Sequence, residues 1–161
     1  GGAGRGGKER IACKRVELVS GFMGMSKKYP KVGVGVIVMK DGKVLIGRRR
    51  EENQKGTWCF PGGAIKFFEL LEDCVRREVK EETGLKVKNI SPIFAVDDFR
   101  KKDKKHWVCV YLRADYISGE PRPADGEFEV WKWMSWNKIP RPRFTALETL
   151  LKAGYKPEGI K

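Results

Sequence analysis

Short apolar runs separated by turn signals occupy much of the chain. The stretch from Val32 to Met39 is apolar and rich in β-branched residues, which favours a strand. The Asp41-Gly42 pair that follows it is a strong hairpin signal. These patterns predict strands at residues 32–39 and 43–49. Similar patterns predict further strands at about 57–60, 87–96, 106–116 and 130–136.

A helical pattern begins after a Pro61-Gly62-Gly63 turn. Apolar residues then recur every three or four positions, which predicts a helix over about residues 69–83. Gly84 is suited to end this helix, and a closing helix is expected at 144–153. The apolar stripe consists of Leu70, Leu71, Cys74, Val75 and Val79. A strand hairpin, a helix, more strands and a final helix together predict an α/β fold with a mixed sheet and helices on both faces.

Three carboxylates, those of Glu78, Glu81 and Glu82, lie away from the apolar stripe. Spacings of three and four residues bring these like charges together, which destabilises a helix unless a cation offsets it. Carboxylate oxygens are hard ligands that suit Mg²⁺ or Mn²⁺, and Mg²⁺ is commonly shared with substrate phosphates. The alternative is a solvated acidic face that neighbouring basic residues balance. Glu69 and Arg77 stand about two turns apart, so an ion pair between them would fix the shape of a metal site.

These residues match a known pattern. Five residues separate Gly63 from Glu69, and seven more separate Glu69 from the run Arg77-Glu78-Val79-Lys80-Glu81-Glu82-Thr83-Gly84-Leu85. The arrangement resembles the Nudix box, with every defining position present. Such a long pattern at fixed spacing is far more specific than a lone glycine-rich triplet. The resemblance covers about residues 32–153 and implies a Nudix-type α/β/α sandwich with a mixed central sheet.

The resemblance also implies a reaction. Nudix enzymes hydrolyse a diphosphate bond in a nucleoside diphosphate linked to another group, X, and they need Mg²⁺ or Mn²⁺. A metal neutralises phosphate charge and lowers the pKa of its bound water. The implied metal ligands are the Gly62 carbonyl, Glu78, Glu81 and Glu82. The implied catalytic residues are Glu81 as a ligand or base, Glu82, and Arg77, which orients the glutamates. Gly63, Glu69 and Gly84 are implied as structural support.

Three positions near the box differ from those of many relatives. Ala64 replaces a basic residue or histidine, Lys66 replaces a glutamate, and Phe68 replaces the glycine that precedes Glu69. None of the three is a defining position. The resemblance therefore still implies hydrolysis, with a shift in a metal ligand or in the geometry of this loop.

Residues outside the box are candidates for completing the site. Several relatives use an additional carboxylate from a later loop, for which Glu127 and Glu129 are candidates, while Lys132 stands where some relatives carry that glutamate. Aromatic side chains are candidates for stacking on a base, with burial in the core as the alternative for each. The candidate substrate-binding residues are Arg48, Phe60, Phe68, Glu129 and Trp133.

Further short motifs narrow the resemblance to one branch. Val-Gly-Val-Gly-Val, Gly-Thr-Trp-Cys-Phe-Pro-Gly-Gly, His106-Trp107-Val108 and Trp131-Lys132-Trp133 resemble the MutT-like branch, which converts nucleoside triphosphates to monophosphates and pyrophosphate. A nucleotide-sugar or ADP-ribose hydrolase is the alternative within the same chemistry. A binding module that senses a nucleotide or RNA without turnover is the alternative from another class. Such a module would be expected to lack a box glutamate, and none is missing here.

Composition bears on domains and partners. The chain has 161 residues, of which 40% are hydrophobic and 34% charged, which suits one domain with a proper core. We expect a partly disordered N-terminal extension at residues 1–30 and the Nudix domain at 31–161. A net charge of +13 raises nucleic acid as a partner. Much of the excess lies in the N-terminal tail and in the lysine-rich run 101–105, without interleaved aromatic residues, so a small phosphorylated nucleotide is favoured.

The cysteines and apolar runs bear on the compartment. Four scattered cysteines and one histidine argue against a zinc site and for reduced, mostly buried thiols. No apolar run reaches the roughly 18 residues of a membrane span, and no signal-peptide core is present. We therefore expect a cytoplasmic protein that does not enter a membrane. A homodimer is one assembly that the resemblance implies, by analogy alone.

Overall fold

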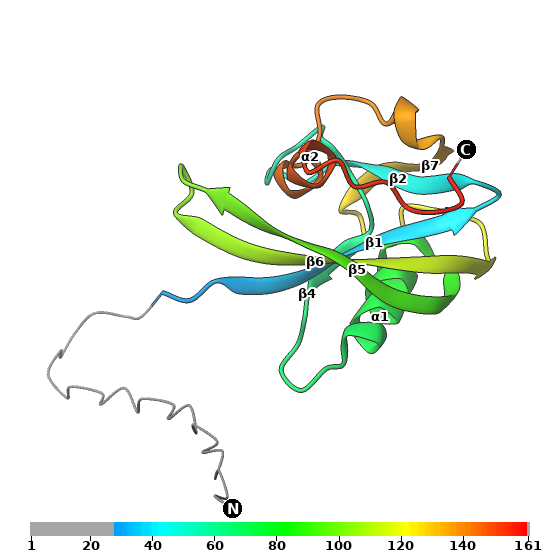
Figure 1. Cartoon of the computed structure of the whole chain (residues 1–161), viewed down its shortest axis with the longest axis horizontal. Coiled ribbons are helices and arrows are strands. Elements are labelled where there is room, and N and C mark those ends of the chain that lie inside the picture. The colour runs from blue at the N-terminus through cyan, green and yellow to red at the C-terminus, as the bar shows by residue number, and fades with distance from the viewer. Residues whose placement is uncertain (1–27, 161) are drawn as a thin grey trace, which may run out of the picture.

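The computed structural model describes residues 28–160, and its centre is a seven-stranded mixed sheet (Figure 1). The strands are β1 (Lys31–Lys40), β2 (Lys43–Arg49), β3 (Trp58–Cys59), β4 (Gly62–Ala64), β5 (Lys86–Arg100), β6 (Lys105–Ser118) and β7 (Phe128–Met134). The helices are α1 (Leu71–Thr83), a single 3₁₀ turn (Trp136–Lys138) and α2 (Thr145–Lys152). The strands and helices predicted within this described part of the chain are all present, together with β4.

Strand β1 organises the sheet. The main strand order is β3-β2-β1-β6-β5, in which β1 and β6 run parallel and the other neighbours run antiparallel. The parallel register extends from the pair Lys31 and Trp107 to the pair Met39 and Asp115. The first half of β1 also pairs with β4, and β7 joins the sheet through β2. The segment that precedes α1 is therefore attached directly to the central strand.

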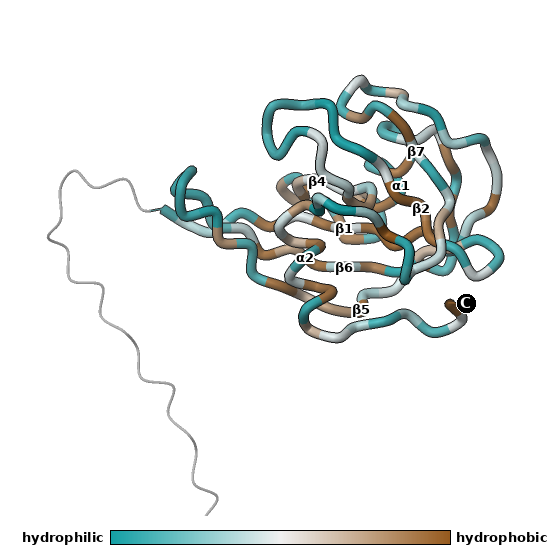
Figure 2. Tube along the Cα trace, turned by 90° about the horizontal axis from the view of Figure 1, so that it is seen from above, coloured by the Kyte–Doolittle hydropathy of each residue, from teal (hydrophilic) through white to brown (hydrophobic). Residues whose placement is uncertain are grey.

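The two faces of the sheet carry separate cores. Alternate residues of β1 point to opposite faces, because the side-chain period of a strand is two. Val36 and Val38 pack with Val75 and Val79 of α1 on one face. The residues in between, such as Ile37, pack with α2 on the other face. Figure 1 shows α1 and α2 on opposite sides of the sheet, and Figure 2 shows the apolar segments gathered inside. The predicted α/β/α sandwich with a mixed sheet is confirmed.

The observed boundaries of α1 have local causes. The helix begins at Leu71 rather than Glu69, because residues 66–69 form a turn in which the Glu69 N–H donates to the Lys66 carbonyl. It ends as predicted at Gly84, whose φ of 77° lies in the left-handed region and whose N–H donates to the Lys80 carbonyl. The turn was expected at residues 61–63, but Gly62–Ala64 form strand β4 because β1 offers them an open edge.

Several expectations concern residues that the structure does not describe or tests only in part. The predicted extension at 1–30 lies mostly outside residues 28–160, as does Cys13, one of the four cysteines. The other three cysteines are free; two are buried and Cys109 is half-buried. Burial raises the pKa of each of these three thiols to about 12. Within the described residues, no helix has the length and apolar character needed to cross a bilayer.

Candidate active site

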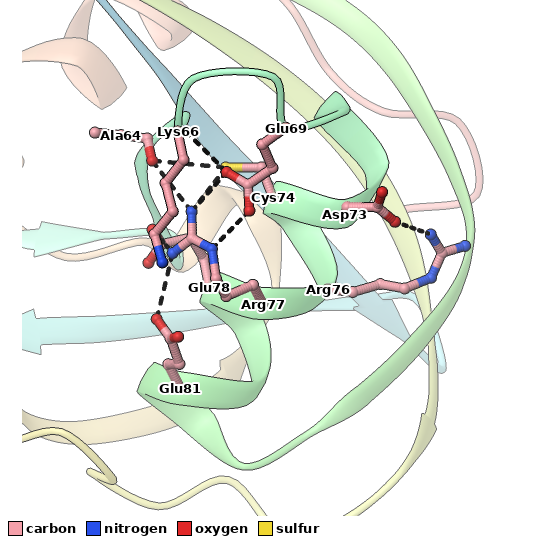
Figure 3. A network of polar contacts seen from close by, with 9 residues as sticks. All are labelled: Ala64, Lys66, Glu69, Asp73, Cys74, Arg76, Arg77, Glu78 and Glu81. Carbon is pink, nitrogen blue, oxygen red and sulfur yellow. Dashed lines mark hydrogen bonds and ion pairs between the residues drawn. The ribbon is translucent and has the colours of Figure 1, made fainter.

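An ion pair between Glu69 and Arg77 holds the loop before α1 against the helix (Figure 3). The two side chains bond in a fork, with Nε to Oε1 at 2.7 Å and Nη2 to Oε2 at 2.8 Å. The Lys66 N–H also donates to Glu69 Oε2, at 2.9 Å. Hydrogen bonds from Arg77 and then from this backbone N–H hold the pKa of Glu69 at about 2. The ion pair expected from the sequence is therefore present, and Glu69 attaches the loop to α1.

Arg77 also contacts two further glutamates of α1. Its Nη1 lies 2.6 Å from Glu78 Oε1 and 3.3 Å from Glu81 Oε2, and its Nη2 donates to the Ala64 carbonyl at 3.2 Å. Bonding to Glu69 raises the pKa of the guanidinium further above its usual range, so Arg77 stays charged. One cation thus orients three carboxylates on two elements. Glu81 is the most open of them, because 53% of its side chain is exposed.

Gly63 makes room for the Glu78 carboxylate. A Cβ atom at this position would lie 2.5 Å from Glu78 Cδ and 2.7 Å from its Oε2, closer than real Cβ contacts come. At Gly62 a Cβ would meet the backbone of Val34 on the neighbouring strand. The two glycines therefore allow strand β4 to lie between β1 and the glutamates of α1.

Glu82 is the buried carboxylate of the group. The residue is only 2% exposed, and its Oε2 accepts a hydrogen bond from the Gly62 N–H at 2.9 Å. Its backbone carbonyl accepts a bond from the indole of Trp131 at 3.0 Å, which fixes this end of the helix to β7. Burial raises the pKa of Glu82 well above its usual range, and repulsion from Glu78, Glu127 and Asp125 adds to the effect. An ionised Glu82 therefore lacks sufficient positive charge nearby.

The loop before β7 brings two more carboxylates to Glu82. Oxygen atoms of Glu82, Asp125 and Glu127 all lie within 4.8 Å of one another. Burial, followed by repulsion from Glu51 and Asp125, raises the pKa of Glu127. Carboxylate oxygens are hard ligands that suit a divalent cation such as Mg²⁺ or Mn²⁺. A cation bound here would relieve the repulsion among these carboxylates. The sequence offered Glu127 and Glu129 as candidates for a later carboxylate that completes the site. Of these two, Glu127 belongs to this cluster.

A cavity of about 230 Å³ opens beside the carboxylates, on the face of the sheet that carries α2. Gly62, Gly63 and Glu127 form the wall that it shares with the acidic cluster. The aromatic lining residues are Phe60, Trp107, Tyr111 and Phe144. The polar lining residues are Arg49, Asn53, Asp98 and Arg100. The cavity has the character of a small-molecule site, with apolar walls and a few directed polar groups.

Asp98 is the buried polar group of this cavity. It is 2% exposed, and its two oxygens accept bonds from Arg100 Nε at 2.8 Å and from the Thr145 hydroxyl at 2.6 Å. The guanidinium of Arg100 lies 4.8 Å from the ring centre of Phe144. These contacts fix a carboxylate and a cation side by side in the wall of the cavity.

Of the five candidate substrate-binding residues, only Phe60 lines the cavity, where it stacks on Trp136 with ring centres 5.9 Å apart. Arg48 and Glu129 instead pair with each other at 3.4 Å on the surface of the sheet. Phe68 is 92% exposed in the turn before α1. Trp133 packs edge-on against Tyr116 in the core beneath α1. Binding roles for these last four remain predictions that the cavity does not support.

Four residues of the site are not among the site residues selected from the sequence, although Arg49 belongs to an arginine run, 48–50, that could have met phosphates or simply formed a basic strand end. Arg49 faces the cavity because side chains alternate along β2, which turns Arg48 to the other face. Asp98 and Arg100 belong to the part of β5 that extends beyond its predicted end. Asp125 lies in a loop whose path follows from the bond of the Ala124 N–H to the Glu82 carbonyl. Apart from that run, strand alternation was the only available clue, and it distinguishes faces without naming a site.

Comparisons with known proteins agree with this geometry. The NUDIX domain family matches residues 29–152. A Methanocaldococcus jannaschii protein described as "ADP-ribose pyrophosphatase" is 33% identical over 118 residues, which cover 72% of this chain and 68% of that protein. A Danio rerio "Oxidized purine nucleoside triphosphate hydrolase" is 33% identical over 106 residues, or 65% of this chain and 66% of that one. The chain spans only about two fifths of the length of other curated relatives, described as "NAD-capped RNA hydrolase NudC".

Among solved structures, the "MutT NUDIX hydrolase from Burkholderia pseudomallei" has a TM-score of 0.70 and 31% sequence identity. The match covers 76% of this chain and 99% of the other. Residues 29–152, which match the family, include every strand and helix of the sandwich and the complete box. This chain therefore belongs to the Nudix family and is a Nudix pyrophosphohydrolase.

Proposed function

We propose that the protein is a metal-dependent nucleoside triphosphate pyrophosphatase, which hydrolyses a ribo- or deoxyribonucleoside triphosphate to the monophosphate and pyrophosphate. One observation carries the proposal: an aromatic-lined cavity shares Glu127 with the carboxylate cluster, and its wall includes Gly62 and Gly63, which lie against Glu82 and Glu78. A base held in this cavity would direct its phosphates towards the carboxylates. The similarity to the Danio rerio triphosphate hydrolase and to the Burkholderia MutT structure supports the same substrate class.

The carboxylates would hold Mg²⁺ or Mn²⁺. Glu82, Asp125 and Glu127 lie within reach of one ion, and Glu78 is close enough to repel both Glu82 and Glu127. The Gly62 carbonyl and Glu81 remain further ligands that the family resemblance implies. When bound, the metal neutralises phosphate charge and supplies water of lowered pKa.

The chain's own residues position these groups. Arg77 is a positioning residue, because it bonds Glu69, Glu78 and Glu81 and is not itself among the residues that line the cavity. Glu69 holds Arg77 in turn. Glu81 is the most exposed of the three box glutamates on α1, which suits either a role as base for the attacking water or a role as ligand. Arg49 and Arg100 are the cations of the cavity and are placed to meet phosphate oxygens or a base edge.

The test is a turnover screen with Mg²⁺ over canonical and oxidised nucleoside triphosphates, ADP-ribose and nucleotide sugars, with products resolved by anion exchange. A triphosphate that yields pyrophosphate supports the proposal. Glu82→Gln should lower kcat by orders of magnitude with the fold intact. Glu72→Gln, an exposed glutamate of α1 paired only with Arg76, is the matched control and should retain activity. Full activity in Glu82→Gln would overturn the site assignment.

ADP-ribose hydrolysis is the second candidate, which the 33% identity to the Methanocaldococcus jannaschii protein favours. The carboxylates and the chemistry would be the same, but the products differ. ADP-ribose gives AMP and ribose 5-phosphate, whereas a triphosphate gives one monophosphate and pyrophosphate. A homodimer, expected by analogy, remains a prediction for sedimentation or light scattering.

A further inference from the structure

The β5–β6 hairpin extends beyond the body of the molecule (Figure 1), and its end is the hydrophilic segment that projects from the body in Figure 2. Its tip is an ordered turn, in which the Asp103 N–H donates to the Arg100 carbonyl and the Lys104 N–H to the Lys101 carbonyl. The lysines of the tip are Lys101, Lys102, Lys104 and Lys105, all exposed. No ion pair between residues 28 and 160 involves any of these four.

Two rings lie beside these lysines. Phe99 and His106 face each other across the hairpin, with ring centres 4.5 Å apart and planes tilted by 34°. Phe99 is 61% exposed, and His106 is held from its other side by Asp97 at 3.2 Å. In the sequence, no aromatic residue interrupts the lysine run, and Phe99 and His106 lie just outside it. Folding of the hairpin brings both rings next to the charges.

The nearby acidic groups do not cancel this charge. Asp97 contacts His106, and Asp98 contacts Arg100 on the opposite face of the hairpin. Asp103 in the turn is the one remaining carboxylate between four lysines. The end of the hairpin therefore presents an exposed ring within a surplus of positive charge. Aromatic platforms with cations alongside are how proteins bind single strands, by stacking on bases and pairing with phosphates.

We propose that the end of the β5–β6 hairpin binds single-stranded nucleic acid, with Phe99 stacking on a base and the tip lysines contacting the flanking phosphates. An anionic membrane is the competing partner for a basic surface. The Phe99 ring, however, lies against the His106 ring and so offers a flat face for stacking on a base, rather than an apolar side chain that could insert into a bilayer. The binding site is separate from the carboxylates, so it does not depend on the proposed hydrolysis. The hairpin nevertheless leads to the cavity, because Asp98 and Arg100 on its other face line that cavity.

The test measures fluorescence anisotropy of a 5′-labelled 12-nucleotide oligouridine with the full chain, in EDTA and over a series of salt concentrations. Phe99→Ala should weaken binding about tenfold. It should leave binding to heparin, an anionic polymer without bases, unchanged. Lys101→Ser/Lys102→Ser should lower the slope of log K against log salt by about 1.4, since each phosphate contact on a single strand contributes about 0.7.

The matched control is Lys86→Ser/Lys88→Ser, which removes two exposed lysines at the opposite end of β5 with the same change in charge. This pair should bind oligouridine as the unmodified chain does. If the two double lysine variants lose affinity for oligouridine equally, binding is attraction by net charge alone, and the proposal is overturned. Unchanged affinity in Phe99→Ala would also overturn it, as would binding to phosphatidylserine vesicles with none to oligouridine. Thermal unfolding of each variant checks that the fold is intact.

Discussion

The Gly62 N–H donates its hydrogen bond to Oε2 of Glu82 at 2.9 Å, which is the one bond from the chain to this buried carboxylate within residues 28–160. One neutral donor does not offset the burial of an ionised group and three neighbouring carboxylates, so the pKa of Glu82 is raised. The ionised carboxylate that would bind a metal therefore destabilises the metal-free fold. Either protonation of Glu82 or a bound cation would remove this unfavourable charge.

Glu82→Gln should therefore raise the stability of the metal-free protein. A carboxyl whose pKa is raised by folding stabilises the fold at low pH and loses that contribution as pH rises through the folded-state pKa. The variant should accordingly unfold at a higher temperature than the unmodified chain in EDTA at pH 8, while the difference shrinks towards pH 5. Calorimetry at both pH values measures this. A lower melting temperature for the variant at pH 8 would contradict the assignment.

Added metal should reverse that order. A cation at one hundred times its Kd stabilises the folded state by about 2.7 kcal/mol, provided that it binds only the folded chain. Mg²⁺ or Mn²⁺ should raise the melting temperature of the unmodified chain and raise that of Glu82→Gln much less. Asp125→Asn should show an intermediate shift, because Asp125 belongs to the same cluster. Equal shifts in all three proteins would place the metal elsewhere.

Glu69 should give a pH dependence of the opposite sign. Its folded-state pKa is about 2, below the ordinary value of 4.5, so its ion pair stabilises the fold above pH 4.5. This contribution is lost as pH falls from 4.5 towards 2. Glu69→Gln should be destabilised at neutral pH and approach the unmodified chain near pH 2. Urea unfolding across this range is the measurement, with Glu72→Gln as a control that should show little difference at any pH.

The two glycines of β4 should respond differently to alanine. At Gly63 the added Cβ meets the end of the Glu78 side chain, which can move, so the protein should fold but lose activity on the order of 100-fold. At Gly62 it meets the backbone of Val34, which cannot move without separating two strands. Gly62→Ala should therefore cost about 1–3 kcal/mol or more of stability. Parallel assays of kcat and urea unfolding separate the two effects, and the reverse pattern would refute this account of the loop.

Phe68 stands in the turn before α1 with φ of 61°, where glycine is the favoured residue. Relief of this conformation, worth about 1–3 kcal/mol, should outweigh the roughly 0.5–1 kcal/mol that glycine costs through the unfolded chain. Phe68→Gly should therefore be neutral or stabilising. Phe67→Gly is the matched control: Phe67 is equally exposed, but its φ is not positive, so it should be destabilised by about 0.5–1 kcal/mol. Equal effects would exclude strain at Phe68.

The parts that the sequence predicts well are those coded within a short stretch. The helix, its end at Gly84 and the pairing of Glu69 with Arg77 all follow from residues within one box, where spacing alone fixes geometry. Asp98 and Asp125 follow from no such spacing. Their places depend on how far the β5–β6 hairpin extends and on how the loop before β7 returns to Glu82. Arg48 and Glu129 illustrate the same limit of sequence-based prediction. Each side chain is chemically suited to a binding site, but in the structure the two form an ion pair with each other.

The parallel pairing of β1 with β6 has a consequence for folding kinetics. The central strand comes first in the domain, and the partner that completes its hydrogen bonding arrives only after β2, β4, α1 and β5 have been made. Contacts between segments so distant in the chain close slowly, because the loop between them loses entropy before any contact forms. Cys109, which lines the cavity, lies on that late strand. The acidic helix should thus form early and the cavity last, so a nascent chain acquires its box before it acquires the proposed substrate site.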